Sequence, residues 1–345
     1  MNDARAGTNP KAGPAEGASG AAASGRSFDL QSAMRSWLGT LLVIFALIIG
    51  FSLLQPRFMS VLNWQNIVIQ GSALLVASLA GTFPILMGSI DLSVGSVASL
   101  VGVSLAVFLE ARTGPVHDLA IPLVLLIGLA CGLLNGILFA VMRVPSFLAT
   151  LGTFFMLDGL AAFIISGIPI PIVMQEPVVP IFDSQIGPVP TMSIWAMAIL
   201  VLSVLGCRYT RLGRNFYAIG GSEPAALIAG INVRFVKLTA FALSGLLAAF
   251  AGVLTSIHSL SGSSGQNADM LLPSIGAIVI GGTALSGGAG GPHRTLLGVL
   301  LLTILINGMQ LLAIDPYLQL IVEGCVVIAA VILSRPKLSV FAAVK

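Results

Sequence analysis

The stretch RYTRLGRNFYAIGGSEPAALIAGINVRFVK, residues 208–237, decides how the rest of the chain is organised. It carries five of the sixteen Lys and Arg residues, in a chain of which only 8% of the residues are charged. Long apolar runs flank it on both sides. Because the basic loops of membrane proteins stay on the cytoplasmic side, we predict that residues 208–237 form a cytoplasmic loop between two membrane-spanning segments.

A short helix is expected in the middle of this loop, over residues 223–231. Pro224 is tolerated in a first helical turn, Ala225 and Ala226 favour helix, and a glycine such as Gly230 commonly follows the end of a helix. An ordinary solvated loop is the simpler interpretation of the same residues. The loop taken alone does not decide between the two.

The composition predicts a polytopic membrane protein. Of the 345 residues 57% are apolar, and the mean hydropathy is +1.03, whereas soluble domains contain about 25% charged residues. Cys131, Cys207 and Cys325 lie within or beside apolar runs without ligand spacing, so we expect neither a disulfide framework nor a metal site. The formal charge of +3 comes from loops and indicates no nucleic-acid partner.

The first 34 residues are rich in Ala, Gly and Ser and have almost no large apolar side chain before Phe28. This composition predicts a disordered tail. The tail lacks the charged start, apolar core and cleavage site of a secretory signal, so we expect it to remain as a cytoplasmic extension. Residues 35–345 would then form the membrane domain.

Ten apolar segments follow the tail, and most of them reach the roughly 20 residues that a spanning helix needs. They cover residues 37–54, 67–87, 93–109, 119–141, 147–166, 191–207, 238–257, 272–288, 295–313 and 318–333. With ten crossings and both termini in the cytoplasm, fourteen Lys and Arg residues lie inside and only Arg57 and Arg112 lie outside, which fits the positive-inside rule. The loop 167–190 has six prolines and no Lys or Arg, so we expect an extended outer segment.

Ten helices divide into two halves of five, which gives the second half the opposite orientation, and inverted repeats are common in transporters. Each half contains a Gly/Ser-rich break, at residues 88–95 and 281–290, and a later Asn-Gly pair, at Asn135 and Asn307. Lipid cannot bond the polar backbone of such breaks, so they must face protein or a water-filled path. The expected fold is an all-α integral membrane protein of about ten transmembrane helices in two inverted five-helix halves, with broken or re-entrant helices.

Four motifs in this order resemble a known family. They are IDLS at residues 90–93, VPSFLATLG at 144–152, EPAALIAG at 223–230 and GGTALSGGAG at 281–290. Over about residues 40–335 the chain resembles the permease subunit of ribose- and xylose-type monosaccharide ABC importers. The resemblance implies a homodimer of permeases in the bacterial plasma (inner) membrane, cytoplasmic ATP-binding subunits and an extracytoplasmic sugar-binding protein. ATP and magnesium would bind to the partner subunits, because this chain has no GxxxxGK[ST] loop.

The resemblance also gives the short helix a role. Glu223, Ala225, Ala226 and Gly230 would dock onto the ATP-binding subunit. Small side chains would let a groove of the partner close around the helix, and an acidic residue suits the positive end of the helix dipole.

Polar residues inside the apolar segments are candidates for the translocation path. They are Asp91, Ser93, Asn135, Asp158, Asn307 and Glu323. Asp91 could equally cap the helix that follows, by accepting bonds from the amides of Ser93 or Val94. Asp158 and Glu323 would each cost about 2.5–3.5 kcal/mol if they faced lipid, so we expect both inside the bundle. There they could line the path, or simply be protonated or hydrogen-bonded, and Glu323 could also lie close enough to the outer interface to reach water.

Two other transport functions remain open. An ABC permease for branched-chain amino acids would share the helix plan, although IDLS favours the sugar branch. An ion-coupled secondary transporter could use Asp158 or Glu323 as a proton carrier, but it would have no need of the EPAALIAG segment. The chain has no HExxH, GxSxG or paired-carboxylate motif, and its three histidines share no ligand spacing, so we expect neither an enzyme nor a metal site.

Overall fold

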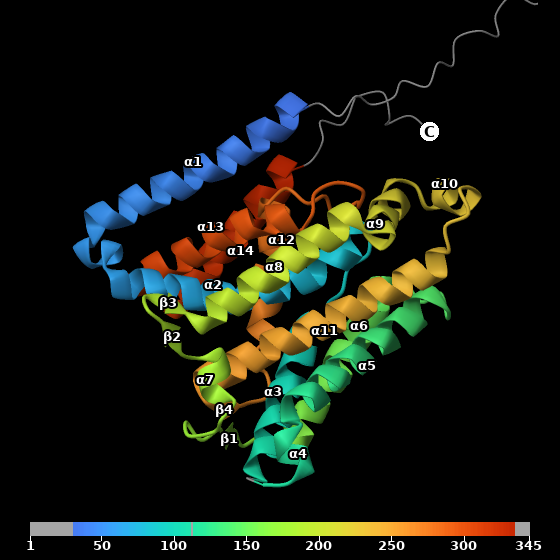
Figure 1. Cartoon of the computed structure of the whole chain (residues 1–345). Helices are drawn as coiled ribbons and strands as arrows, with labels where there is room; N and C mark the ends of the chain where they lie inside the picture. The colour runs from blue at the N-terminus through green and yellow to red at the C-terminus, as the bar shows by residue number, and fades with distance from the viewer. Residues whose placement is uncertain (1–29, 112, 335–345) are drawn as a thin grey trace, which may run out of the picture.

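The computed structural model describes the backbone of residues 30–111 and 113–334 and, within these ranges, the side chains of residues 38–111 and 113–332. These residues form an all-α bundle (Figure 1). Six helices are long and apolar enough to cross a membrane: α2 (Val61–Leu86), α5 (Ala120–Ala140), α6 (Ser146–Ile164), α8 (Thr191–Tyr209), α11 (Val233–Ser259) and α13 (Pro292–Leu311). Four further apolar helices of the described ranges complete the ten that the sequence predicts: α1 (Leu30–Leu54), α3 (Val94–Glu110), α12 (Leu271–Ile280) and α14 (Pro316–Ser334).

Short elements connect the long helices. They are η1 (Pro56–Met59), α4 (Pro115–Asp118), α7 (Val179–Phe182), α9 (Arg211–Gly221), α10 (Glu223–Ile228) and η2 (Ala268–Met270). Four two-residue strands form two antiparallel pairs: β1 (Ile170–Pro171) with β4 (Ser261–Gly262), and β2 (Gln185–Ile186) with β3 (Val189–Pro190).

The loop 167–190 is folded, and the prediction that it is merely extended is wrong. Pro180 fits the first turn of α7, where a missing N–H removes no helical bond. Phe182 is buried, and Trp195 Nε1 donates a 3.0 Å bond to the carbonyl of Ile181. Packing of these apolar side chains therefore outweighs the extended preference of the prolines.

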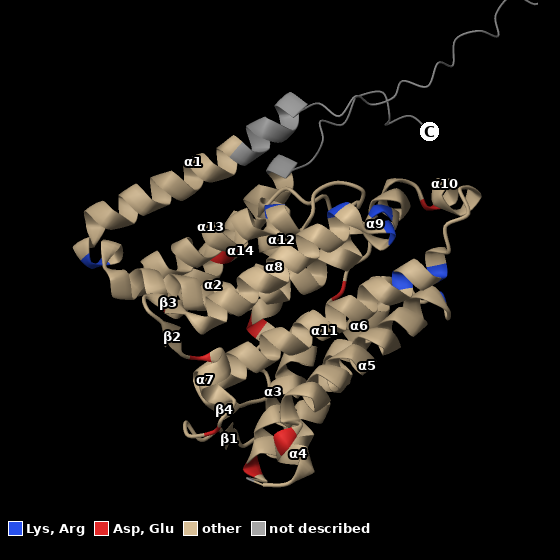
Figure 2. Cartoon of the chain, in the orientation of Figure 1, with Lys and Arg blue, Asp and Glu red and all other residues tan. Residues whose placement is uncertain are grey.

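Charge distinguishes the two ends of the bundle (Figure 2). Apart from Arg57 in η1, the described Lys and Arg residues gather at the end that carries α9 and α10. We call this the basic end, and we call the other end, which carries α4, α7 and the strands, the distal end. Long apolar helices between two such polar ends are the architecture of a multi-pass membrane protein.

Corresponding helices of the two halves run in opposite directions. α2 ends at the basic end, where the carbonyl of Leu86 accepts a 2.9 Å bond from the amide of Gly288, whereas α11 begins at that end, after α10. α3 runs towards the distal end and α12 runs away from it (Figure 1). This is the inverted arrangement of two halves that the sequence predicts.

α11 lies at the centre of the bundle and packs against α2, α3 and α5. Glycines bring its backbone close to that of α5, because a Cβ atom at Gly245 would collide with the carbonyl oxygen of Gly128 and lie 2.6 Å from the amide nitrogen of Gly132. Such small residues are what allow helices to approach closely in membranes, where no hydrophobic effect drives them together.

After α11 the chain enters the bundle again without helical structure, which the sequence analysis did not predict. Residues 260–267 run along α3, with Gly262 packed against Gly102 and the amide of Asn267 donating a 3.2 Å bond to Ser99 Oγ. A Cβ atom at Gly95 would lie 2.6 Å from the carbonyl oxygen of Asn267. Small residues spaced along one face of α3 therefore form the groove that holds this segment.

The two breaks that the sequence predicts are both present. Residues 87–93 separate α2 from α3, and residues 281–291 separate α12 from α13. They are not equivalent members of the two halves, because chain order matches the break after α2 with the segment 260–267 after α11. Pairing the two predicted breaks was therefore wrong, although both are rich in glycine.

α1 begins at Leu30, inside the segment that we expected to be a tail up to residue 34. Gln31, Ala33 and Met34 are good helix formers, which accounts for the earlier start. Residues 1–29, which make up the rest of the predicted tail, lie outside the described residues, as do Arg112 and residues 335–345.

Candidate functional site

The break between α2 and α3 is held by a buried carboxylate. Asp91 is 3% exposed, and its Oδ1 atom accepts a 2.9 Å bond from the amide and a 2.7 Å bond from the hydroxyl of Ser93. Its Oδ2 atom accepts a 2.7 Å bond from the hydroxyl of Ser244 on α11. The predicted bond from the amide of Ser93 is present, but it forms a turn before α3, because α3 begins at Val94 and its N-cap is Ser93, without a side-chain cap bond.

The network continues into α5 and α6. Asn135 Nδ2 donates a 2.7 Å bond to Ser93 Oγ, and Asn135 Oδ1 accepts a 2.8 Å bond from Thr153 Oγ1. Thr150 Oγ1 accepts a 3.0 Å bond from the amide of Leu92. Asp91, Ser93 and Asn135, three of the predicted path residues, therefore lie together in a closed and fully bonded cluster.

A junction of glycines at the basic end joins both predicted breaks to α9. A Cβ atom at Gly220 of α9 would collide with the carbonyl oxygen of Leu86 and with the amide of Gly288. A Cβ atom at Gly287 would lie 2.5 Å from the amide of Gly88. The three segments touch backbone to backbone, which only glycine permits.

Tyr217 adds a side-chain bond to this junction. Its hydroxyl donates a 3.0 Å bond to the carbonyl of Gly290. Burial raises the pKa of Tyr217 to about 12, so the hydroxyl keeps its proton and can donate at neutral pH. The basic segment 208–237 is thus tied to the breaks between the membrane helices.

The short helix expected in this segment is present as α10. Gly230, with φ +79°, follows the end of the helix. The amide of Gly230 donates to the carbonyl of Leu227, and the amide of Ile231 donates to the carbonyl of Ala226, each at 3.0 Å. This is the Schellman arrangement, and it explains the need for glycine. α10 stops at Ile228, so the prediction of a helix to residue 231 was slightly too long.

The predicted docking residues do not all reach the surface. Ala225 and Gly230 are exposed, but Ala226 is 3% exposed and packs inside its own chain. Both oxygens of Glu223 accept bonds from Lys237 Nζ, at 2.8 and 2.9 Å. The apolar surface of α10 is provided instead by its last turn, in which Ile228 is 90% exposed.

A cavity of about 660 Å³ opens in the distal half of the bundle, between α2, α8, α11, α12, α13 and α14. We call it the distal cavity. Its polar lining consists of Gln70, Thr255, His258, Ser259, Gln266, Asp269, Thr303, Gln310 and Glu323. Glu323 is the predicted path residue that the structure places in this cavity.

Two polar atoms of the cavity lining are buried without a hydrogen-bond partner. They are Gln266 Oε1 and Thr303 Oγ1, and Thr303 as a whole is 3% exposed. In Asn267, the residue after Gln266, both polar atoms of the side chain, Oδ1 and Nδ2, also have no partner. A buried polar group without a partner costs about 1–3 kcal/mol, so a bound molecule whose hydroxyl groups reached the atoms of Gln266 and Thr303 would remove that cost.

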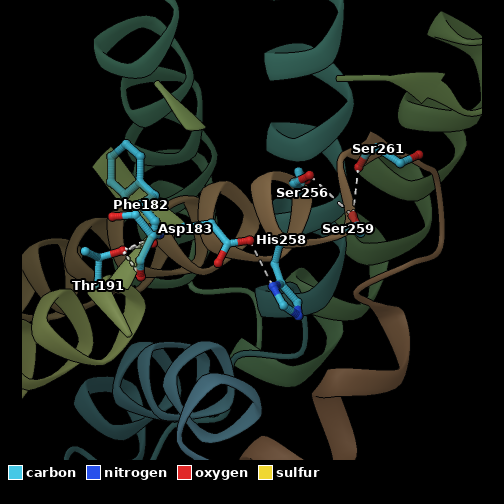
Figure 3. Close-up of polar contacts among 8 residues, drawn as sticks. Phe182, Asp183, Thr191, Ser256, His258, Ser259 and Ser261 are labelled. Atoms are coloured by element: carbon cyan, nitrogen blue, oxygen red, sulfur yellow. Dashed lines mark hydrogen bonds and ion pairs between the residues drawn. The ribbon is translucent and has the colours of Figure 1, made fainter. Parts of the chain in front are cut away.

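The rim of the distal cavity is fixed by polar contacts (Figure 3). His258 Nδ1, at the end of α11, lies 3.1 Å from Asp183 Oδ2 in the loop after α7. Thr191 Oγ1 donates a 2.8 Å bond to the carbonyl of Phe182, and Ser259 Oγ donates bonds to Ser256 and Ser261. The distal loop is thereby attached to the two helices that border the cavity.

The remaining path candidates lie elsewhere. Asp158 of α6 is half-buried with Oδ1 unpartnered, and among the described residues it is not part of the lining of the distal cavity. Asn307 of α13 is buried with Oδ1 unpartnered, one turn beyond Thr303. Asp158 and Glu323 therefore do not share a site. Over the residues searched, no group of three His, Cys, Asp or Glu residues could hold a metal ion.

Comparison with known proteins gives consistent matches. Residues 63–331 match the family described as branched-chain amino acid transport system permease component. The chain is 40% identical over 305 residues to the ribose import permease protein RbsC of Bacillus subtilis, covering 87% of this chain and 93% of that protein. It is 40% identical over 297 residues to the probable ABC transporter permease protein YphD of Escherichia coli, covering 86% of this chain and 88% of that one. With RbsC of Escherichia coli the identity is 34% over 310 residues, 88% of this chain and 96% of the relative.

The chain belongs to this family of ABC transporter permeases. The four motifs and the helix plan had predicted the same family. The matched range includes both breaks, the segment 208–237 and the residues of the distal cavity.

Sequence reasoning missed several residues of the permease that the structure brings together. Ser244, Thr150 and Thr153 looked like ordinary small residues of apolar helices, and nothing in their local pattern shows that they bond Asp91 or Asn135. The segment 260–267 did carry a signal, because LSGSSGQN combines Gly and Ser with two amides directly after a long apolar run. That pattern could have identified the re-entrant segment.

Proposed function

We propose that this permease forms the membrane-spanning part of an importer that carries a monosaccharide across the bacterial inner membrane. It works as a homodimer, with both termini in the cytoplasm. Separate subunits bind ATP and magnesium, and an extracytoplasmic binding protein delivers the sugar. The chain itself contributes transport and no catalysis. The names of the two ribose import permeases support the choice of substrate class.

The lining of the distal cavity is the observation that carries the choice of a sugar. Its polar groups are hydroxyls, amides, one imidazole and two carboxylates, and among the described residues no Lys or Arg lines it. A branched-chain amino acid brings an ammonium group, with which Asp269 or Glu323 could pair, and also a carboxylate, which no Lys or Arg of the described lining would meet. A neutral sugar brings hydroxyl groups, which both donate and accept hydrogen bonds. The amino-acid description of the family is therefore the weaker guide for this chain.

The distribution of charge supports the orientation. Basic loops favour the cytoplasmic side, which assigns the basic end to the cytoplasm and the distal cavity to the outer side. α10 then faces the ATP-binding subunit. Its exposed residues Ala225, Leu227 and Ile228 offer an apolar surface, and Glu223 and Gly230 fix the helix in place. Ala226 supports the helix from within rather than touching the partner.

Uptake into proteoliposomes tests the substrate and the energy source. The permease is purified from native membranes with the subunits that accompany it and is reconstituted with or without internal ATP. We expect a stoichiometric ATP-binding subunit and ATP-dependent uptake of labelled ribose or xylose, with little uptake of leucine. Uptake driven by a proton gradient without ATP, and lost in Glu323→Gln or Asp158→Asn, would instead establish the secondary transporter.

Cysteine labelling tests the orientation. In a background without Cys131, Cys207 and Cys325, single cysteines are placed in the loop 167–190 and in residues 215–233. A membrane-impermeant thiol reagent added to intact cells should label the first set and leave the second unlabelled. The opposite pattern would reverse the orientation and remove the docking role of α10.

A further inference from the structure

Among the described residues, four side chains with a buried and unpartnered polar atom lie on the re-entrant segment and on α13, whereas Asp158 of α6 lies elsewhere. Gln266 and Asn267 lie at the end of residues 260–267, and Thr303 and Asn307 lie one turn apart on α13. Each of these four side chains has at least one buried atom without a partner. Native proteins bond the large majority of their buried polar groups, so a local group of exceptions calls for a bound partner.

The fold places two of these side chains in the distal cavity together with two carboxylates. Gln266 and Asp269 come from the re-entrant segment and η2, Thr303 comes from α13, and Glu323 comes from α14. Thr303 is held against Gly71 of α2, where a Cβ atom would lie 3.4 Å from its Oγ1 atom. To contact a ligand in the cavity, this buried hydroxyl has to rotate about the Cα–Cβ bond of Thr303.

We propose that the distal cavity is a binding site for a neutral, polyhydroxylated ligand within a single copy of the permease. Thr303 Oγ1 and Gln266 Oε1 bond hydroxyl groups of the ligand, and Glu323 and Asp269 accept further hydroxyl protons. The proposal rests on the proposed function and extends it, because it assigns the sugar a resting site on the permease itself, before the path towards the basic end.

The distal cavity fits a neutral sugar both in its volume and in the side chains that line it. A volume of about 660 Å³ falls within the range of roughly 300–1,000 Å³ that is usual for small-molecule sites. Apolar side chains such as Leu74, Leu254 and Met270 share the lining with the polar ones, as the two faces of a pyranose ring require. Because carboxylates accept strong hydrogen bonds, two of them favour a ligand with several neighbouring O–H groups.

The test measures sugar binding by the permease and its ATP-binding subunits in detergent, without the binding protein. Thermal stabilisation is titrated with D-ribose, with D-xylose and with L-leucine, in sodium chloride and in choline chloride. We expect both sugars to raise the melting temperature in either salt and leucine to leave it unchanged. Stabilisation by sodium ions alone would mean that the unpaired oxygens hold a cation, and the proposal would be overturned.

Variants of two threonines, one in the lining of the distal cavity and one outside it, locate the site. Thr303→Val keeps the shape of the side chain but removes the unpartnered hydroxyl, so the Kd for ribose should rise about 3- to 10-fold, while Thr303→Ser should restore most of the affinity. Thr239→Val on α11 is the matched control, because Thr239 does not line the distal cavity and its hydroxyl already donates a 2.9 Å bond to the carbonyl of Val236. Its Kd should stay within about twofold of the parent value.

The outcomes separate this site from the proposed function. If the parent complex imports no monosaccharide, the proposed function fails. If the parent complex imports ribose but its melting temperature does not respond to ribose, or if Thr303→Val and Thr239→Val change the Kd equally, only the site is wrong. Gln266→Leu is a second test of the binding site. If the Kd for ribose were unchanged in both Gln266→Leu and Thr303→Val, the proposed site would also be overturned.

Discussion

The break after α2 and the break after α11 follow the two longest described helices, at corresponding places in the inverted halves. They differ in whether their buried polar groups have hydrogen-bond partners. In the first break three donors satisfy the carboxylate of Asp91, and both amide atoms of Asn135 are bonded. In the second break both polar side-chain atoms of Asn267 lack a partner. On α13, Oδ1 of Asn307, the Asn-Gly residue that matches Asn135, also lacks one.

This difference separates a structural role from a binding role. A closed network in a low-dielectric interior holds its members rigidly, and removal of one member leaves the others unsatisfied. Buried groups without a partner are unfavourable, and that cost is removed only when a bound molecule supplies the missing hydrogen bonds. The first break therefore fastens α3, α5, α6 and α11 together beside the glycine junction, whereas the second break keeps unpaired polar groups next to Gln266 of the distal cavity, where we propose that a ligand binds.

The largest effect is expected at the glycine junction, from Gly220→Ala. The added methyl group would collide with the backbone of Leu86 and Gly288, which cannot move away as a flexible side chain could. We expect the variant to lose about 3 kcal/mol of folding free energy, at the upper end of the usual cost of overpacking, and to lose uptake. The melting temperature of the purified protein and sugar uptake by cells measure the two effects.

Gly221→Ala is the control for this variant. It changes the next residue of α9 in the same way, but nothing lies within 4 Å of the added Cβ atom, and Gly221 has no positive φ. Its melting temperature and uptake should match those of the parent. Equal losses in the two variants would mean that α9 tolerates no added side chain, and that the junction has no special role.

The second effect, at the buried carboxylate, tests whether the first break is held as a unit. Asp91→Ala leaves the hydroxyls of Ser93 and Ser244 and the amide of Ser93 without their acceptor, so we expect a loss of about 2–3 kcal/mol. Ser244→Ala removes only one donor and should cost about 1 kcal/mol. A double-mutant cycle in thermal unfolding should show coupling between the two positions. Additive effects would argue against a closed network.

The sequence was sufficient to predict the features that depend on hydropathy and on local backbone chemistry. Ten apolar runs gave the ten helices, and the Glu-Pro-Ala-Ala start with Gly230 predicted α10. The conformational demand at Gly230 is local, because φ is +79° and the last carbonyls of the helix need the following amides. The bond from the amide of Ser93 to Asp91 is local too, since the two residues are only two positions apart.

The parts that the sequence could not predict depend on contacts between distant segments. Ala226 has the same side chain as Ala225, and only the packing of α10 against its neighbours buries one and exposes the other. Ser244 lies 153 residues from Asp91, so no pattern links them. The distal cavity likewise takes its lining from six helices. Glu323 could be identified as an unusual acid, but its neighbours could not.

A smaller effect is expected at Gly230, which concerns the basic end alone. A β-branched residue there would have to adopt the left-handed conformation, at a cost of about 1–2 kcal/mol. We expect Gly230→Val to distort the end of α10, so that ATP hydrolysis continues while uptake falls, and to leave membrane insertion intact. Gly230→Asn should behave like the parent, because Asn tolerates this conformation. Normal uptake by Gly230→Val would count against docking through α10.

The smallest effect concerns the distal end, where His117 of α4 contacts the loop that follows α6. His117 Nε2 lies 2.8 Å from Glu176 Oε2, and Nδ1 lies 3.2 Å from Asp118 Oδ1. The contact with Glu176, and then that with Asp118, raise the pKa of His117 above its ordinary value of 6.5. A raised pKa means that the folded state binds the proton more tightly than the unfolded chain does. The stabilisation is therefore complete below pH 6.5 and is lost as the pH rises through the raised pKa.

The parent should accordingly melt slightly above His117→Gln at pH 5.5 to 6, and the difference should disappear at alkaline pH. Asp118→Asn should have the weaker effect of the two acidic partners, because Asp118 is 73% exposed and its contact is the longer one, whereas Glu176→Gln should abolish most of the pH dependence. Ribose binding should be unchanged in His117→Gln, since His117 is not among the residues that line the distal cavity. A difference in melting temperature that grew with pH would mean that the neutral imidazole makes the stabilising contact, and that the distal loop is held by something other than this ion pair.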